Sequence, residues 1–163
     1  LSGYHRLGYS KLMCQNTTGV FIADTPRKRQ AAFEVRKRVF VDEQGVPSEI
    51  EWDEYDAPQA DTHHFVSFLD GSPVGAARWR RKTTTAGKVE RVAVIKSARG
   101  NGWGRRLMNA VETDARSAGI QTSVLHAQLR VIEFYHTLGY RHVGSLFEES
   151  DIQHIKMTKS LRS

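Results

Sequence analysis

The stretch that decides the fold is Val89-Glu90-Arg91-Val92-Ala93-Val94-Ile95-Lys96-Ser97-Ala98-Arg99-Gly100-Asn101-Gly102-Trp103-Gly104-Arg105-Arg106. It begins with β-branched apolar residues typical of a strand and ends in the basic start of an amphipathic helix. Gly100, Gly102 and Gly104 lie between the two. Because glycines leave the backbone accessible at a helix N-terminus, this glycine corner is predicted to bind an anion through N–H groups.

Two common phosphate-binding motifs differ from this corner. A Walker loop ends in Gly-Lys-Ser or Gly-Lys-Thr, and that ending is absent from the corner. The Gly-x-Gly-x-Gly spacing, with no acidic strand end about 20 positions later, also differs from the dinucleotide fingerprint. The anion is therefore not expected to be held by either motif.

The length of 163 residues fits one domain, which is large enough to bury a hydrophobic core without disulfide or metal cross-links. Residues 1–12 lack an initiator Met and any signal-peptide pattern, so we expect a leader or expression remnant there and a single domain over 13–163. The lone Cys14 excludes an internal disulfide, and no apolar run approaches the roughly 20 residues of a membrane span. A cytoplasmic protein without membrane contact is expected.

The net charge of +6 comes from 24 Lys and Arg against 18 Asp and Glu, spread along the whole chain. A solvated basic surface with a local anion pocket is therefore favoured over nucleic-acid binding, and no nucleic-acid partner is expected. The histidines, His63 and His64 among them, lack zinc-ligand spacing. No metal site is predicted.

Strand and helix patterns alternate along the chain. A strand at 19–23 precedes a helix that Thr25 caps and Pro26 begins, and a hairpin at 64–69 and 73–80 precedes the strand at 89–94. After the helix behind the glycine corner, the strand at 122–127 is expected to run parallel to the strand at 89–94. A helix at 131–138 and strands at 140–143 and 152–157 complete the order.

Residues 41–58 are acidic and lack periodicity, which predicts a long loop or a broken helix. Two interpretations stay open. The carboxylates are either a substrate lid that attracts a cationic amine or surface acids that balance nearby lysines and arginines.

Three segments resemble the GCN5-related N-acetyltransferase (GNAT) family. Arg99–Gly104 is similar to its Arg/Gln-x-x-Gly-x-Gly/Ala pyrophosphate signature, and Phe134–Tyr140 is similar to its Phe-Tyr-x-x-Leu-Gly-Tyr block. Val39–Pro47 resembles the ElaA/YjcF-like branch. The resemblance implies a single-domain α/β (α+β) fold: a mixed sheet of about six to seven strands with an antiparallel first half, about four flanking helices, and a central parallel pair splayed to admit CoA.

The resemblance also implies a donor site. The backbone of Val92, Ala93 and Val94 would bind the pantetheine arm and the thioester carbonyl. The pyrophosphate would bind at the corner, with Arg99 and Arg105 preferred over Lys96 and Arg106 as the cations. The cofactor-binding residues predicted in this way are Val92, Ala93, Val94, Arg99, Gly100, Asn101, Gly102, Trp103, Gly104, Arg105 and Gln128, the last standing where many relatives have Asn.

Tyr135 holds the position of the family's proton donor to the departing thiolate, although a tyrosine there also suits a core. Glu90 and His126 compete as the general base; Glu90 could instead point to solvent or pair with Arg91, and His126 could be structural. Cys14 has no adjacent His or helix N-terminus, so direct transfer is expected rather than an acyl-enzyme.

These features predict an N-acetyltransferase that moves an acetyl group from its co-substrate acetyl-CoA to a primary amine in a ternary complex. The acceptor is expected to be a small cationic amine, with a protein amine as the other choice. The alternatives are a nucleic-acid-binding module that holds phosphates and a GNAT-fold protein that binds CoA with weak catalysis. The resemblance implies a homodimer through the C-terminal strands.

Overall fold

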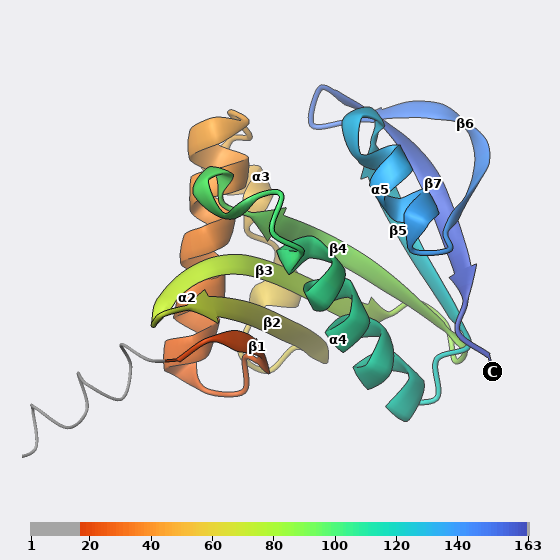
Figure 1. Cartoon of the computed structure of the whole chain (residues 1–163). Helices are drawn as coiled ribbons and strands as arrows, with labels where there is room; N and C mark the ends of the chain where they lie inside the picture. The colour runs from red at the N-terminus through yellow and green to blue at the C-terminus, as the bar shows by residue number, and fades with distance from the viewer. Residues whose placement is uncertain (1–16, 163) are drawn as a thin grey trace, which may run out of the picture.

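The computed structural model describes residues 17–162, so residues 1–12 and Cys14 lie outside the described part. Seven strands form one sheet in the order β1-β2-β3-β4-β5-β7-β6 (Figure 1). Only β4 and β5 pair in parallel. The expected mixed sheet with a central parallel pair is confirmed. The strands are β1 (Gly19–Ile22), β2 (Thr62–Leu69), β3 (Ser72–Arg81), β4 (Ala86–Val94), β5 (Thr122–Gln128), β6 (Arg141–Glu149) and β7 (Ile152–Ser160).

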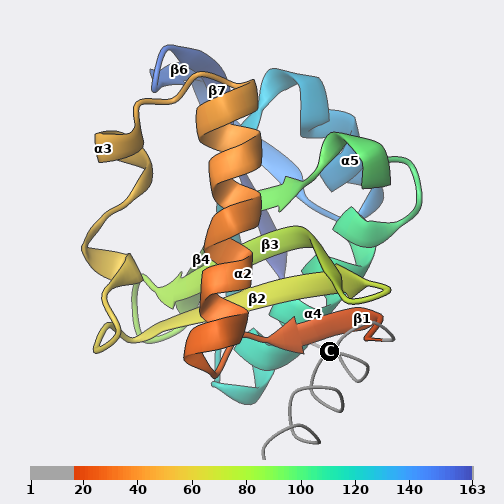
Figure 2. The same ribbon diagram turned by 90° about the vertical axis from the view of Figure 1, so that its left-hand side faces the viewer.

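Helices cover both faces of the sheet. α2 (Pro26–Arg36) lies on one face and α4 (Trp103–Ser117) on the other (Figures 1 and 2). The expected cap is present, because Thr25 Oγ1 accepts a hydrogen bond from the Lys28 N–H at 3.2 Å. The remaining helical segments are η3 (Lys96–Ala98), η4 (Leu129–Val131) and α5 (Ile132–Thr137), together with three in the acidic region.

The core has two parts, one on each side of the sheet. Val35 and Val39 pack with Val66 beneath α2, and Leu107 and Val111 of α4 pack in the second cluster. That second cluster also holds Trp79, Leu125 and Tyr135. Among the described residues, no helix is both long and apolar enough to cross a membrane.

The acidic region 41–58 is a series of short helices. Helix α2 continues as a π-helical segment, η1 (Lys37–Glu43), and is followed by α3 (Ser48–Glu51) and η2 (Glu54–Asp56). The Asp53 carboxylate caps η2 by accepting from the Tyr55 N–H at 3.0 Å. Of the two expectations for this region, the broken helix is the one the structure shows.

The parallel pair separates partway along its length. Pairing of β4 with β5 runs from Ala86↔Thr122 to Val89↔Leu125, although the two strands continue to Val94 and Gln128. Strands β3 and β4 form a bulge at this point. Ala76 pairs with Ala93 and Arg78 pairs with Glu90, so two residues of β4 lie opposite the single β3 residue Ala77. One of them, Arg91, has φ +58°. Bulges bend and twist a strand, which turns the end of β4 away from β5.

Candidate active site

A cavity of about 910 Å³ lies where β4 and β5 separate. It brings together predicted residues from five segments of the chain. Those on its wall are Glu90, Val92, Ala93, Val94, Arg99, Gly100, Gly102, Trp103, Gly104, Arg105, His126, Gln128 and Tyr135. Asn101 does not line it; its side-chain amide donates to the Ala98 and Arg99 carbonyls at 3.2 Å and so braces the glycine corner.

The glycine corner presents unpaired backbone donors to the cavity. Gly100 and Gly102 have φ +79° and +83°, a conformation that strains any residue with a side chain. The first bond of α4 runs from the Arg106 N–H to the Gly102 carbonyl, and no acceptor within residues 17–162 receives the N–H groups of Trp103 to Arg105. Such free N–H groups at a helix N-terminus fit an anion.

Gly104 has a packing role. A Cβ at this position would lie 3.0 Å from Cζ of Phe134. The glycine therefore lets the first turn of α4 approach the Phe134 ring of α5. The two motifs recognised separately in the sequence meet at this contact.

Arg99 is already paired in the structure. Its Nη1 and Nη2 each donate to Glu43 at 2.7 Å, and its Nε donates to the Val94 carbonyl at 2.9 Å. The hydrogen bonds between the Arg99 guanidinium and the Glu43 carboxylate raise the pKa of Arg99 and lower the pKa of Glu43. Arg105 also lies on the cavity wall, and its side chain makes a single hydrogen bond to the described part of the chain, a 3.4 Å contact with Thr137 Oγ1.

Tyr135 is 7% exposed and packs edge-on against Phe134 and Tyr140 at ring-centroid distances of 5.0 and 5.8 Å. Burial raises the pKa of its phenol, so the hydroxyl stays protonated. Within the described residues no protein group hydrogen-bonds to this hydroxyl. A neutral donor is therefore held on the cavity wall.

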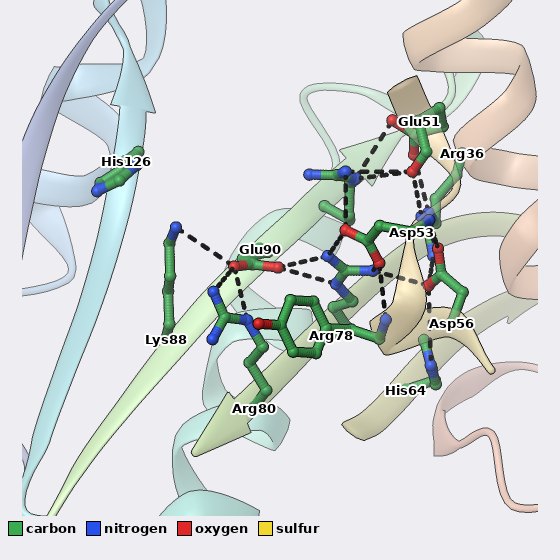
Figure 3. Close-up of polar contacts among 12 residues, drawn as sticks. Arg36, Glu51, Asp53, Asp56, His64, Arg78, Arg80, Lys88, Glu90 and His126 are labelled. Carbon is green, nitrogen blue, oxygen red and sulfur yellow. Dashed lines mark hydrogen bonds and ion pairs between the residues drawn. The ribbon is translucent and has the colours of Figure 1, made fainter. Parts of the chain in front are cut away.

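Glu90 is held by cations (Figure 3). Its Oε2 accepts from Arg78 Nε at 3.0 Å, and its Oε1 lies 3.1 Å from Arg80 Nε and 3.4 Å from Lys88 Nζ. Burial opposes ionisation, but the charge and hydrogen bonds of Arg78, with Arg80 and Lys88, outweigh it and lower the pKa of Glu90. A carboxylate stabilised in this way is a weak base.

His126 lines the cavity from β5, and Figure 3 shows it on that strand, apart from the group around Glu90. Its Nδ1 lies 2.8 Å from Glu149 Oε1, and its ring packs edge-on against Phe147. In the described chain Nε2 has no protein partner, which leaves it free for a ligand in the cavity. Sequence reasoning missed Glu149, because only the pairing of β5 with β7 and of β7 with β6 brings it beside His126.

A buried ion-pair network behind β4 was also missed. Arg36 and Arg78 are each 1% exposed and bind carboxylates of the acidic region. The Asp56 carboxylate accepts hydrogen bonds from both arginines. Burial opposes the ionisation of Asp56, but the hydrogen bond and the positive charge of Arg36 outweigh this effect and lower the pKa of Asp56 to about 2. One signal was available: Arg36 follows Ala32 by four positions and so lies on the apolar face of α2.

No group of three or more His, Cys, Asp or Glu side chains in residues 17–162 is arranged to bind a metal ion.

Comparison with known proteins decides the family. A model of the acetyltransferase (GNAT) domain matches residues 22–161. The chain belongs to the GNAT acetyltransferase family. The family recognised from the glycine corner and from Phe134–Tyr140 is thus confirmed, and GNAT proteins transfer acyl groups from acetyl-CoA.

Relatives and solved structures agree with this GNAT assignment. The chain is 40% identical to the uncharacterized N-acetyltransferase YjcF of Bacillus subtilis over 85% of this chain and 96% of YjcF. The crystal structure of Escherichia coli ElaA is similar with a TM-score of 0.76 and 25% identity, over 88% of this chain and 99% of ElaA. An aminoglycoside 6'-N-acetyltransferase complexed with coenzyme A shares the fold at a TM-score of 0.69 and 17% identity, over 88% of this chain and 97% of that one.

Proposed function

We propose that this GNAT protein transfers the acetyl group of acetyl-CoA to a primary amine by direct attack in a ternary complex. The observation that supports this most strongly is the cavity between the separating ends of β4 and β5, which runs from the glycine corner to His126. The donor would enter at the corner and the amine at the opposite end.

The donor half is assigned to backbone groups. Beyond Val89, no strand within residues 17–162 pairs with the edge of β4 that faces β5, so Val92, Ala93 and Val94 can pair with a pantetheine arm as an added strand would. A free N–H near Val92 or Ala93 would stabilise the oxyanion formed on the thioester carbonyl. The N–H groups at Gly100 to Gly104, with Arg105, would hold the pyrophosphate. The side-chain amide of Gln128, whose Nε2 donates to Gln44 Oε1 at 3.0 Å in this structure, would reorient to hydrogen-bond the pantetheine arm.

The proton steps are assigned to Tyr135 and His126. The neutral amine attacks the carbonyl carbon, loses one N–H proton as the amide forms and displaces the CoA sulfur as the C–S bond breaks; the proton lost by the nitrogen and the proton regained by Tyr135 exchange with solvent. Nε2 of His126 accepts the amine proton, and Glu149 at 2.8 Å steadies the resulting charge. The Tyr135 hydroxyl donates to the departing sulfur. His126 is preferred over Glu90 because Arg78, Arg80 and Lys88 occupy both carboxylate oxygens of Glu90.

Calorimetry with acetyl-CoA, followed by measurement of free CoA thiol in the presence of reactive primary amines, tests the proposal. We expect binding of acetyl-CoA and amine-dependent thiol release. Titration with a short DNA duplex is the control. Tight duplex binding together with no heat from acetyl-CoA would favour the nucleic-acid alternative and overturn the proposal, whereas CoA binding without transfer would indicate a weakly catalytic protein.

A further inference from the structure

Charged side chains surround the end of the cavity that lies away from the glycine corner. Together these side chains are called the acceptor-end cluster. Figure 3 shows most of it. Its five cations are Arg36, Arg78, Arg80, Lys88 and Arg91, and its four carboxylates are Glu51, Asp53, Asp56 and Glu90. Burial lowers the pKa of the adjacent His64 to about 4, so it adds no charge near neutral pH. The cluster itself therefore contains one more cation than carboxylates.

The carboxylates of the cluster that reach the cavity wall are already paired. Glu51 binds Arg36 Nε at 2.9 Å and Arg91 Nε at 3.2 Å through its two oxygens. Asp53 binds Arg78 through both oxygens, at 2.8 and 2.7 Å. Burial raises the pKa of Glu51, against the opposing effect of Arg91 and Arg36. A cationic group on a substrate would displace an existing cation rather than fill a vacant site.

The other two carboxylates on the wall lead to the same conclusion. Both oxygens of Glu90 contact cations of the cluster. Glu149, on the β5 side, is bound to His126. In the described part of the chain, the cavity therefore offers no carboxylate without a partner to a cationic acceptor.

Lys88 and Arg80 carry the excess positive charge. They are directly opposite each other on β4 and β3, and both are partnered by the single Oε1 atom of Glu90. Like charges at opposed positions destabilise a sheet. The Arg80 guanidinium lies 4.0 Å above the Tyr55 ring, which fixes its orientation. The two side chains are 18% and 19% exposed, so a ligand in the cavity can reach them away from bulk water.

We infer that the acceptor is a primary amine that carries a carboxylate or a phosphate group, and that this anion binds between Lys88 and Arg80. The inference rests on the proposed function, because it names the acceptor of the same reaction. The anion would remove the repulsion between the two cations and gain charge-assisted hydrogen bonds from them.

The same arrangement would assist the chemistry. A positive environment lowers the pKa of a bound ammonium group, which increases the fraction of neutral amine able to attack. A polyamine would bring further positive charge into a positive site. The acceptor class therefore differs from the cationic molecule that the acidic composition of residues 41–58 suggested, because the acids of this region nearest the cavity end, Glu51, Asp53 and Asp56, are paired with arginines.

Matched acceptors test the inference. Acetyl-CoA-dependent thiol release would be measured with aminoethyl phosphate against ethanolamine, 4-aminobutyrate against butylamine, and spermidine. Binding of each to the CoA-saturated protein would be followed by calorimetry. We expect kcat/KM for the acceptor that carries the anionic group in at least one pair to exceed that of its partner without this group about tenfold or more, with spermidine the poorest. The pair that responds distinguishes phosphate from carboxylate.

Two variants locate the effect. Lys88→Met should lower kcat/KM for the anion-bearing member of the pair far more than for its partner, which would remove most of the preference. Lys82→Met removes the same charge from an exposed position off the cavity wall and should leave the preference intact. Equal loss of preference in both variants would contradict a site at Lys88.

The outcomes separate this inference from the proposed function. If spermidine or the neutral amines react best, the acceptor class is wrong and the acetyl transfer stands. If none of the compounds binds or reacts while acetyl-CoA still binds, the acceptor class is again wrong and the donor half stands. If acetyl-CoA itself does not bind, the proposed function fails.

Discussion

Replacing Tyr135 with Phe removes one hydroxyl from a ring that is otherwise held by Phe134 and Tyr140. We expect kcat to fall about 100-fold, the scale of a lost general acid, with KM for acetyl-CoA and the free energy of unfolding nearly unchanged. Steady-state kinetics and urea unfolding measure the two effects. Because burial raises the pKa of Tyr135, its ionisation should not limit activity near neutral pH.

Tyr140→Phe is the matched control for Tyr135→Phe. Tyr140 is 1% exposed, does not line the cavity, and hydrogen-bonds Ser123 Oγ at 2.8 Å. Its loss should cost about 1 kcal/mol of stability and leave kcat unchanged. A larger kcat effect at Tyr140 than at Tyr135 would contradict the proton-donor assignment.

His64 makes stability depend on pH. Burial lowers its pKa in the folded protein from 6.5 to about 4, so between these values the unfolded chain binds a proton that the folded chain does not. Stability is therefore complete above pH 6.5 and falls as the pH is lowered towards 4, by about 3 kcal/mol at most. Urea unfolding across this range should show a shallower fall for His64→Gln; an identical slope would contradict the prediction.

Asp56 acts in a separate pH window. Its pKa is lowered from 3.8 to about 2, so its contribution is present above 3.8 and is lost only as the pH falls towards 2. The first phase of acid destabilisation is therefore assigned to His64 and the later one to Asp56. Neither phase could be read from the sequence, because each pKa depends on burial against Arg36 and Arg78.

At the scale of elements, the two ends of α4 offer a matched pair of glycines. Gly102 and Gly119 have φ +83° and +85°, and no atom lies within 4 Å of a Cβ added at either. Ala at each position should cost about 1–2 kcal/mol of stability through backbone strain alone. Only Gly102→Ala disturbs the N–H groups at the glycine corner, so it alone should raise the Kd for acetyl-CoA, about tenfold by calorimetry. Equal Kd values for the two variants would place the pyrophosphate elsewhere.

Most elements were predictable from local patterns. The Thr25 cap, the hairpin at 64–69 and 73–80 and the crossover from 89–94 to 122–127 were each set by residues close in sequence, and the structure confirms all three. The acidic region was less predictable, because its short helices are stabilised by distant partners. Asp53 and Asp56 bind Arg78 of β3, more than 20 positions away.

At the scale of the whole molecule, the cavity separates the sheet into two parts that are joined by four pairs of residues between β4 and β5. A ligand in the cavity would contact both parts. At about 100 times its Kd, acetyl-CoA should add about 2.7 kcal/mol of stability. We expect a Tm increase of about 5–10 °C, with slower amide hydrogen exchange along β4 and β5.

Gly102→Ala serves as the control for this shift, because it weakens donor binding without closing the cavity. Its Tm increase at the same acetyl-CoA concentration should be smaller. A full shift in the variant, or none in the unaltered protein, would contradict the placement of the donor between β4 and β5.

The sequence by itself determined the family, the order of strands and helices and the glycine corner, because each depends on residue type and on spacing within a few turns or strands. Only the tertiary structure decided how the charges pair. In the folded chain Arg99 pairs with Glu43, and Lys88 lies opposite Arg80 on the neighbouring strand. Carboxylates of the acidic region form ion pairs with Arg36 and Arg78. Electrostatic energy depends on distance and burial in three dimensions, so the charge that an acceptor meets could be read only from the fold.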